Sequence, residues 1–263
     1  MNRQRVCGVL AMMLVALGLL VAPVRAEVAG RPAPGARSAY AVTGVRVFGY
    51  SVKGRALRAY RIGDPTSTTK VVVLATMHGD EAGPARVLLN LVRGAPVRGA
   101  DIWLVPYLNR DGMARHTRKN ARGVDLNRNF PVGWVRRTGT YNSGRRPASE
   151  PETRALMRFL GNVRPGYVIS FHQPLYGVDT SYGKTRALGL RLARGLELPR
   201  KLFNCNSGCH GTMTQWFNRK FPGAALTVEY GYRMSTRQVT RTGPQGILDS
   251  VFATREPLPP SSP

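Results

Sequence analysis

The chain alternates between short apolar runs rich in β-branched residues and longer segments in which apolar residues recur every three or four positions. The short runs are typical of buried β-strands, and the longer segments are typical of amphipathic helices. Strands are expected at residues 44–52, 56–63, 70–77, 101–109, 167–172 and 224–231, and helices at residues 83–94, 149–163, 184–198 and 211–221. This alternation predicts an α/β fold with an open sheet, helices on both faces and an antiparallel hairpin at its start.

The two ends of the chain differ in composition from its middle. Residues 1–26 combine a basic head, an apolar run and small residues before the end, which predicts a signal peptide cleaved after Ala26; an uncleaved membrane anchor is the alternative. Residues 27–43, rich in Gly, Pro and Ala, predict a flexible linker, and residues 255–263 a disordered tail. Residues 44–254 are then expected to form a single domain of a secreted, periplasmic or cell-wall-associated protein.

The chain is strongly basic, with 39 Lys and Arg against 14 Asp and Glu and a formal net charge of +25. Such a charge favours anionic partners, and for a secreted protein these include the carboxylates and phosphates of a bacterial cell wall. The basic residues are scattered along the whole chain, however, which is also typical of a solvated surface. Because no Arg-rich block is interleaved with aromatic residues, nucleic acid is not an expected partner, and a membrane is expected only if the signal stays uncleaved.

Three cysteines are present, and Cys7 leaves with the predicted signal. The remaining pair, Cys205 and Cys209 in CNSGC, predicts a local disulfide in an oxidising compartment. A metal cluster that includes His210 is the weaker interpretation, because no fourth ligand lies nearby.

Polar side chains follow the ends of four predicted strands: His78, Glu81, Asn109, Asp111, His172 and Glu229. In open α/β sheets, functional groups gather outside the carboxyl ends of the strands. Two imidazoles and one carboxylate, with a fourth position open to water, form a common hydrolytic zinc site. His78, Glu81 and His172 are therefore candidate zinc ligands, although a His-x-x-Glu pair alone also fits a polar turn.

The segment LNRDGMARHTRKNARGVDLNRNFP, residues 108–131, is unusually rich in Asn, Arg and Asp. These residues also fit ordinary turn chemistry. A hydrolytic site, however, needs a carboxylate such as Asp125 to orient a ligand histidine, and an amide and a guanidinium such as Asn127 and Arg128 to bind a substrate carboxylate.

In combination and in this order, the segments HGDE, NRDG, RKNARGVDLNRNFP, SFH and TVEYG resemble the zinc carboxypeptidase superfamily, the M14 metallopeptidases, over about residues 70–232. Within it they are most similar to bacterial murein peptide amidases, which cleave the bond between γ-D-glutamyl and diaminopimelic acid in peptidoglycan peptides. The resemblance implies a mixed sheet flanked by helices, one zinc ion per chain and a peptidoglycan-derived peptide as substrate.

The resemblance also implies a role for each matching residue. The zinc ligands would be His78, Glu81 and His172. Glu229 would be the general base, and Arg118 would polarise the scissile carbonyl. Asn127 and Arg128 would bind the terminal carboxylate of the substrate, and Asp125 would lie behind the first zinc histidine.

Two features are left open. Pancreatic-type members carry a mobile tyrosine over the site, for which Tyr176, Tyr182 and Tyr230 are all candidates. Asp80, which lies between two of the ligands, is a candidate for binding the amino group of a diamino acid, and it equally fits a cap of the following turn.

The sequence thus predicts a secreted zinc-dependent amidase or carboxypeptidase that acts on cell-wall peptides, at the γ-D-glutamyl-diaminopimelate bond. A carboxypeptidase that trims ordinary peptides is one alternative. An aspartoacylase-like deacylase fits the NRDG and GVDLNRNFP segments less well. A non-catalytic cell-wall-binding protein is a further alternative, but it gives no reason for an intact set of ligands and base.

Overall fold

The computed structural model describes residues 41–181, 183–203 and 209–257. The predicted signal, most of the predicted linker and most of the predicted tail lie outside these ranges. Among the described residues, no helix combines the length and apolar character needed to cross a bilayer.

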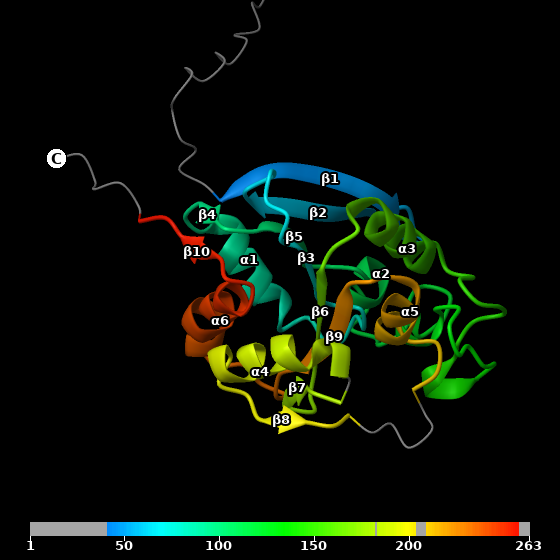
Figure 1. Cartoon of the computed structure of the whole chain (residues 1–263). Helices are drawn as coiled ribbons and strands as arrows, with labels where there is room; N and C mark the ends of the chain where they lie inside the picture. Colours follow the sequence, from blue (N-terminus) through cyan, green and yellow to red (C-terminus); the bar gives the residue numbers. More distant parts are fainter. Residues whose placement is uncertain (1–40, 182, 204–208, 258–263) are drawn as a thin grey trace, which may run out of the picture. The chain divides into compact units, whose positions relative to one another are not determined.

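A mixed β-sheet of eight strands lies at the centre of the fold (Figure 1). The strands are β1 (Val42–Tyr50), β2 (Ala56–Gly63), β3 (Lys70–Leu74), β5 (Asp101–Val105), β6 (Tyr167–His172), β7 (Gly177–Asp179), β8 (Arg200–Lys201) and β9 (Ala224–Glu229). Their order is β1–β2–β5–β3–β6–β9–β7–β8. The neighbours β5, β3, β6 and β9 are parallel, β1 and β2 form an antiparallel hairpin, and β7 runs antiparallel to β9. The predicted mixed sheet and its opening hairpin are confirmed.

Helices cover both faces of this sheet. They are α1 (Ala85–Arg93), α2 (Arg110–Met113), α3 (Pro151–Val163), α4 (Arg186–Gly195), α5 (Met213–Lys220) and α6 (Gly243–Ser250). Short helical turns lie at Leu126–Arg128, Gly139–Tyr141, Gly183–Thr185 and Gln238–Thr242, and a small second sheet pairs β4 (Val97–Arg98) with β10 (Thr254–Arg255).

The core has two parts because successive side chains of a strand point to opposite faces. In β3, Val71 and Val73 pack in one cluster with residues of α1, α4 and α6, whereas Val72 and Leu74 pack in the other with residues of α3 and α5. The apolar run that identified β3 in the sequence is thus buried on both faces, as expected of a central parallel strand.

The parallel strands bring their carboxyl ends to one edge of the sheet (Figure 1). His172 is the last residue of β6 and pairs in register with Glu229, the last residue of β9. The loop after β3, which carries His78, emerges at the same edge because β3 and β6 are parallel neighbours. The topology therefore gathers side chains that are far apart in the sequence.

Two glycines bring the loop after β3 against α2. A Cβ atom on Gly79 would lie only 2.1 Å from the carbonyl carbon of Gly112. The side chain of Asn109 holds Gly112 in place. Its Oδ1 accepts from the backbone N–H of Gly112 at 2.9 Å, and its Nδ2 donates to the carbonyl of Arg118 at 3.1 Å. The HGDE and NRDG segments thus meet through their backbones, which explains a glycine in each of them.

Asp111, which follows β5, binds the turn between β1 and β2 and does not line the cavity described below. Its carboxylate accepts from the backbone N–H of Lys53 at 2.9 Å and forms an ion pair with Arg55 at 2.5 Å. Burial raises the pKa of Asp111, but the hydrogen bonds from Lys53 and Arg55 outweigh it and lower the pKa below its usual value.

We expect Gly79→Ala to lower the free energy of unfolding by about 1–3 kcal/mol, because the added methyl group meets backbone that cannot move aside cheaply. Urea unfolding followed by circular dichroism measures the change. Gly161→Ala is the matched control: this glycine lies in α3 with open space around it, so alanine should leave stability unchanged or raise it. Equal stabilities of the two variants would contradict the close contact between the two segments.

Candidate active site

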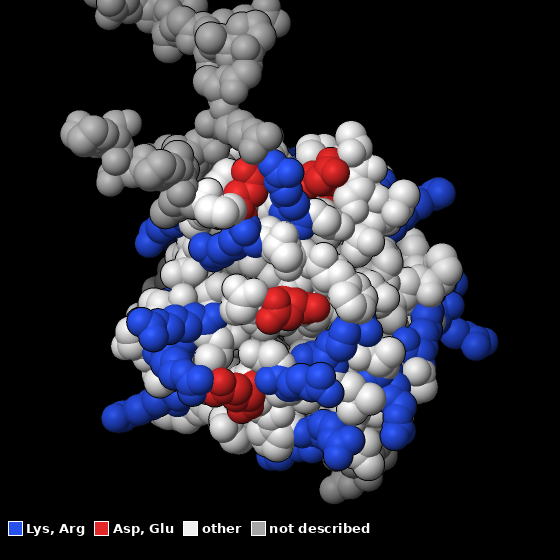
Figure 2. Space-filling model, turned by 60° about the vertical axis from the view of Figure 1, so that its left-hand side comes forward, with Lys and Arg blue, Asp and Glu red and all other residues white. Residues whose placement is uncertain are grey.

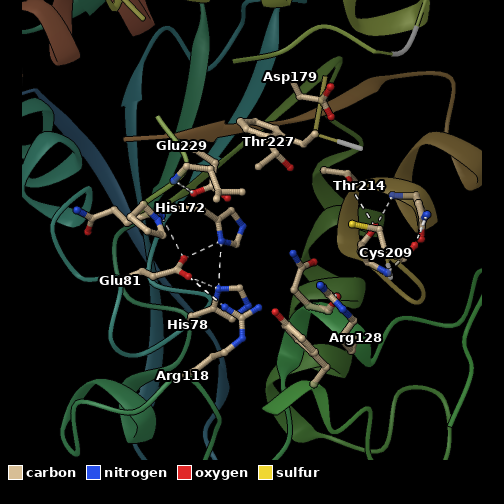
Figure 3. A pocket seen from close by; sticks show the side chains of 18 of the residues that line it. His78, Glu81, Arg118, Arg128, His172, Asp179, Cys209, Thr214, Thr227 and Glu229 are labelled. Carbon is tan, nitrogen blue, oxygen red and sulfur yellow. Dashed lines mark hydrogen bonds and ion pairs between the residues drawn. The ribbon is translucent and has the colours of Figure 1, made fainter. Parts of the chain in front are cut away.

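A cavity of about 410 Å³ lies at the carboxyl edge of the sheet (Figure 3). Of the predicted site residues, it is lined by His78, Glu81, Arg118, Asn127, Arg128, His172 and Glu229. Asp125 is fully buried behind this wall. The structure thus brings together side chains from the loop after β3, from the segment 118–128, and from the ends of β6 and β9.

His78, Glu81 and His172 present their donor atoms to one another. The Nδ1 atom of His78 lies 2.7 Å from Oε1 of Glu81, and the Nδ1 atom of His172 lies 2.9 Å from Oε2 of the same carboxylate. One ligand atom from each of the three residues lies within 4.8 Å of the others. Two imidazole nitrogens and a carboxylate are the donors that hydrolytic zinc sites use, so the residues present fit this ion.

Each imidazole is oriented through its other nitrogen. The Nε2 atom of His78 lies 3.1 Å from Oδ1 of Asp125, and the Nε2 atom of His172 lies 3.0 Å from the hydroxyl of Ser170. These contacts turn both Nδ1 atoms toward Glu81 and are the kind of partner that holds ligand histidines in metal sites. Asp125 was predicted from the sequence in this role, whereas Ser170, two residues before His172 on the same face of β6, was not.

The electrostatics of this group favour a cation. Burial lowers the pKa of His78, but the carboxylates of Asp125 and Glu81 outweigh it and raise the pKa to about 9. Burial also raises the pKa of Glu81 and Asp125, yet His78 more than compensates and holds both well below their usual range. Buried carboxylates that favour a proton on a neighbouring imidazole would also favour a metal ion in the place of that proton, with the imidazole in its neutral form.

Glu229 lies beside the three donors. Its side chain is largely buried, and its Oε2 accepts from the backbone N–H of Leu175 at 3.2 Å. Burial raises the pKa of Glu229, and the neighbouring His172 opposes this shift. A carboxylate with a raised pKa next to a hydrolytic metal site is suited to accept and return a proton.

Arg128 lies across the cavity from His78 and Glu81 (Figure 3), and Asn127 lines the same cavity. Arg128 donates from Nη1 to the carbonyl of Asn127 at 2.8 Å, and its buried Nε has no hydrogen-bond partner among the described residues. The Oδ1 atom of Asn127 accepts from the backbone N–H of Met213 at 3.0 Å, at the start of α5. The guanidinium therefore retains donors for an anionic group in the cavity.

Arg118 lies between the metal donors and Tyr141. Its Nε donates to Oδ2 of Asp125 at 3.0 Å, and its Nη1 lies 3.3 Å from Oε1 of Glu81. The guanidinium carbons of Arg118 and Arg128 lie 5.4 and 5.2 Å from the ring centroid of Tyr141, within cation–π range. Tyr141 was not predicted as a site residue, because its segment carries none of the motifs that singled out the others.

The tyrosines considered from the sequence occupy other places. Tyr230 is fully buried and stacks on Phe171 with 5.5 Å between ring centroids. Tyr176 is exposed and does not line the cavity. Tyr182 lies outside the described residues, as does Cys205, so the Cys205–Cys209 disulfide stays a prediction.

Asp80 does not line the cavity of the three candidate donors. Its side chain is exposed and lines a neighbouring hollow, the wall of which also includes Glu81 and Arg118. Its position in the sequence between His78 and Glu81 does not bring it inward, because the turn directs it to solvent. An acid not singled out from the sequence, Asp179, does line the cavity.

Comparison with known proteins agrees with this geometry. The model of the zinc carboxypeptidase family matches residues 38–238. The chain belongs to this family. Murein peptide amidase A of Escherichia coli (strain K12) is 34% identical over 142 residues, which cover 49% of this chain and 58% of the relative. The protein of that name from Vibrio campbellii is 32% identical over 157 residues, which cover 54% of this chain and 62% of the relative.

Solved structures support the same assignment. The murein-tripeptide amidase MpaA from Escherichia coli O157 aligns with a TM-score of 0.62 and 28% identity, covering 77% of this chain and 88% of that one. Carboxypeptidase A from Helicoverpa armigera aligns with a TM-score of 0.67 over 81% of this chain and 68% of that one, and its 19% identity shows a shared fold alone.

We expect Asp125→Asn to weaken zinc binding by about 10- to 100-fold, because an amide orients His78 less strongly than a carboxylate does. Competition with a chromophoric chelator measures the affinity. His172→Ala, which removes a donor atom, should lose more, and Asp249→Asn, at an exposed position on α6, should lose nothing. If Asp125→Asn and Asp249→Asn bind zinc equally, Asp125 does not support the metal site.

Proposed function

We propose that this chain is a secreted zinc-dependent amidase of the carboxypeptidase type, which hydrolyses the γ-D-glutamyl-diaminopimelate bond of cell-wall peptides. The observation that carries the proposal is the content of one cavity: the His78, Glu81 and His172 donors, the carboxylate of Glu229, and the guanidinium of Arg128, whose Nε has no hydrogen-bond partner among the described residues. The likeness to murein peptide amidases supports the choice of substrate. Each chain would hold one zinc ion at the three donors.

The chemistry is divided among the residues around the cavity. A zinc ion, when bound at the three donors, lowers the pKa of water and polarises a carbonyl group. Glu229 then accepts the proton of the attacking water and delivers it to the nitrogen of the leaving residue. Arg118 lies against the donors and is placed to stabilise the negative charge that develops on the carbonyl oxygen.

Substrate docking follows from the opposite wall. Arg128 retains unsatisfied donors, and Asn127 is held by α5 so that its amide faces the same space. A C-terminal carboxylate bound there would direct the preceding amide bond toward the metal donors and Glu229. This arrangement is the reason to expect cleavage of a terminal residue.

The location of the activity is part of the proposal. The leader-like pattern of residues 1–26 supports secretion. Figure 2 shows Lys and Arg side chains distributed over the visible face with few Asp and Glu side chains between them. We infer that this positive surface favours approach to an anionic cell wall without a single docking patch on that face.

Mass spectrometry of the products tests the proposal directly. The zinc-loaded protein should release free diaminopimelate from a γ-D-glutamyl-diaminopimelate peptide. Cleavage of only ordinary α-linked peptides would instead make the protein a general carboxypeptidase. Binding to purified wall without any turnover would make it a non-catalytic wall-binding protein.

We expect Glu229→Gln to lower kcat by about 10²- to 10⁴-fold while zinc binding persists, because the amide keeps the shape of the side chain but cannot accept a proton. Steady-state kinetics with a parallel zinc assay measures both. Glu197→Gln, at an exposed glutamate paired with Arg237, is the matched control and should keep full activity. Turnover near wild type in zinc-loaded Glu229→Gln would exclude Glu229 as the base.

Arg128→Ala should lower kcat/KM for substrates with a free C-terminal carboxylate by about 10- to 150-fold, the usual effect of losing a charged hydrogen bond. Amidation of that carboxylate should slow the wild-type protein but affect the variant little. The exposed Arg58→Ala on β2 serves as the control. If the wild-type protein cleaves free and amidated peptides equally well, Arg128 does not bind a terminal carboxylate.

A further inference from the structure

Asp179 is a buried acid in the cavity with no cationic partner among the described residues. It is the last residue of β7, and only 8% of its surface is exposed. Its Oδ1 accepts from the backbone N–H of Ser181 at 2.9 Å and from the hydroxyl of Ser181 at 2.5 Å. Within the described part of the chain, Oδ2 has no hydrogen bond and Asp179 forms no ion pair. Oδ2 is thus available to accept a hydrogen bond from a cationic group in the cavity that Asp179 lines.

The strand register fixes where Asp179 lies relative to the proposed base. β7 runs antiparallel to β9, with Gly177 opposite Glu229 and Val178 opposite Val228. The same register continued by one residue places Asp179 opposite Thr227. Thr227 and Glu229 are two residues apart on β9, so their side chains share a face, and both line the cavity. Asp179 therefore lies about 7 Å along the strand from the level of Glu229.

The charges of the cavity are separated in space. Arg118 and Arg128 lie on one side of it, and in Figure 3 Asp179 lies at the other end, beyond Glu229 and Thr227. The other acids that line the cavity, Glu81 and Glu229, belong to the metal donors and to proton transfer. Asp179 is thus the acid left for a positive group on the substrate.

We propose that the carboxylate of Asp179 binds the side-chain ammonium group of the leaving residue and so selects a diamino acid. The leaving residue has its α-carboxylate at Arg128 and its scissile nitrogen near Glu229, so its side chain extends along β9 toward Thr227 and Asp179. A lysine-like or diaminopimelate-like side chain has a length that suits this span. The inference deepens the proposed function, on which it rests for the orientation of the substrate.

The test compares leaving residues that differ only in the ammonium group. Peptides that end in L-lysine or L-norleucine and carry the same acyl part are tested as substrates. The enzymes compared are the zinc-loaded wild type, Asp179→Asn and Asp80→Asn. Asparagine keeps an oxygen that can accept from Ser181, so the turn after β7 is preserved, and an unchanged thermal midpoint checks this. Calorimetric binding of free L-lysine and L-norleucine gives a second readout that does not depend on turnover.

We expect wild type to prefer the lysine peptide, and Asp179→Asn to lower kcat/KM for it by about 10- to 100-fold while norleucine cleavage changes little. Free lysine should lose affinity to a similar extent. Asp80→Asn, at the exposed acid outside the cavity, should keep the wild-type ratio. A lysine-to-norleucine ratio that survives in Asp179→Asn, or that collapses in Asp80→Asn instead, overturns the assignment.

Peptides with two kinds of acyl group distinguish failure of this inference from failure of the proposed function. Each leaving residue is presented on an α-linked and on a γ-D-glutamyl-linked peptide. If only α-linked peptides are cleaved and the lysine preference still requires Asp179, the wall-peptide function is wrong and the role of Asp179 stands. If γ-linked peptides are cleaved with no dependence on Asp179, the function stands and this inference is wrong. If no peptide is cleaved, equal affinity of wild type and Asp179→Asn for free lysine overturns it.

Discussion

The carboxylate of Asp125 is the contact on which the rest of the site depends. Its Oδ1 lies 3.1 Å from Nε2 of His78 and also accepts from the backbone N–H of Asn127 at 2.9 Å. Its Oδ2 accepts from Arg118. One buried group thus orients a metal ligand, begins the helical turn that carries Asn127 and Arg128, and positions the arginine beside the donors. A side chain with a single acceptor atom, or one displaced from this place, would loosen three parts of the site together.

The sheet and its loops supply the rigidity that this contact requires. His172 and Glu229 are adjacent in register on parallel strands, so their separation is set by backbone hydrogen bonds. The loop carrying His78 is fixed differently, through the contact of Gly79 with Gly112. The positions of His78 and Glu81 therefore depend on a packing contact between the HGDE and NRDG segments, which are apart in the sequence but adjacent in space.

The sequence predicted those parts of the molecule that depend on local pattern. β3 was recognisable because it is buried on both faces, and motifs in a characteristic order singled out His78 and Glu229, which line one cavity. Helix α6 was missed, because its sequence GPQGILDS contains two glycines and a proline, all poor helix formers. Asp179 was missed for another reason: β7 is only three residues long, and its position depends on pairing with β9. Asp80 was considered for an amino group because it is adjacent to two predicted ligands in sequence, but its side chain is exposed.

The central claim is that the three donors hold one zinc ion through particular atoms, with the opposite ring nitrogens kept for Asp125 and Ser170. Anomalous diffraction at the zinc absorption edge, from crystals of the zinc-loaded protein, tests it most directly. The account predicts one strong peak per chain, about 2.0–2.2 Å from the Nδ1 atoms of His78 and His172 and from a carboxylate oxygen of Glu81. A peak bound to the Nε2 atoms, or a peak elsewhere with none at these three residues, would contradict it.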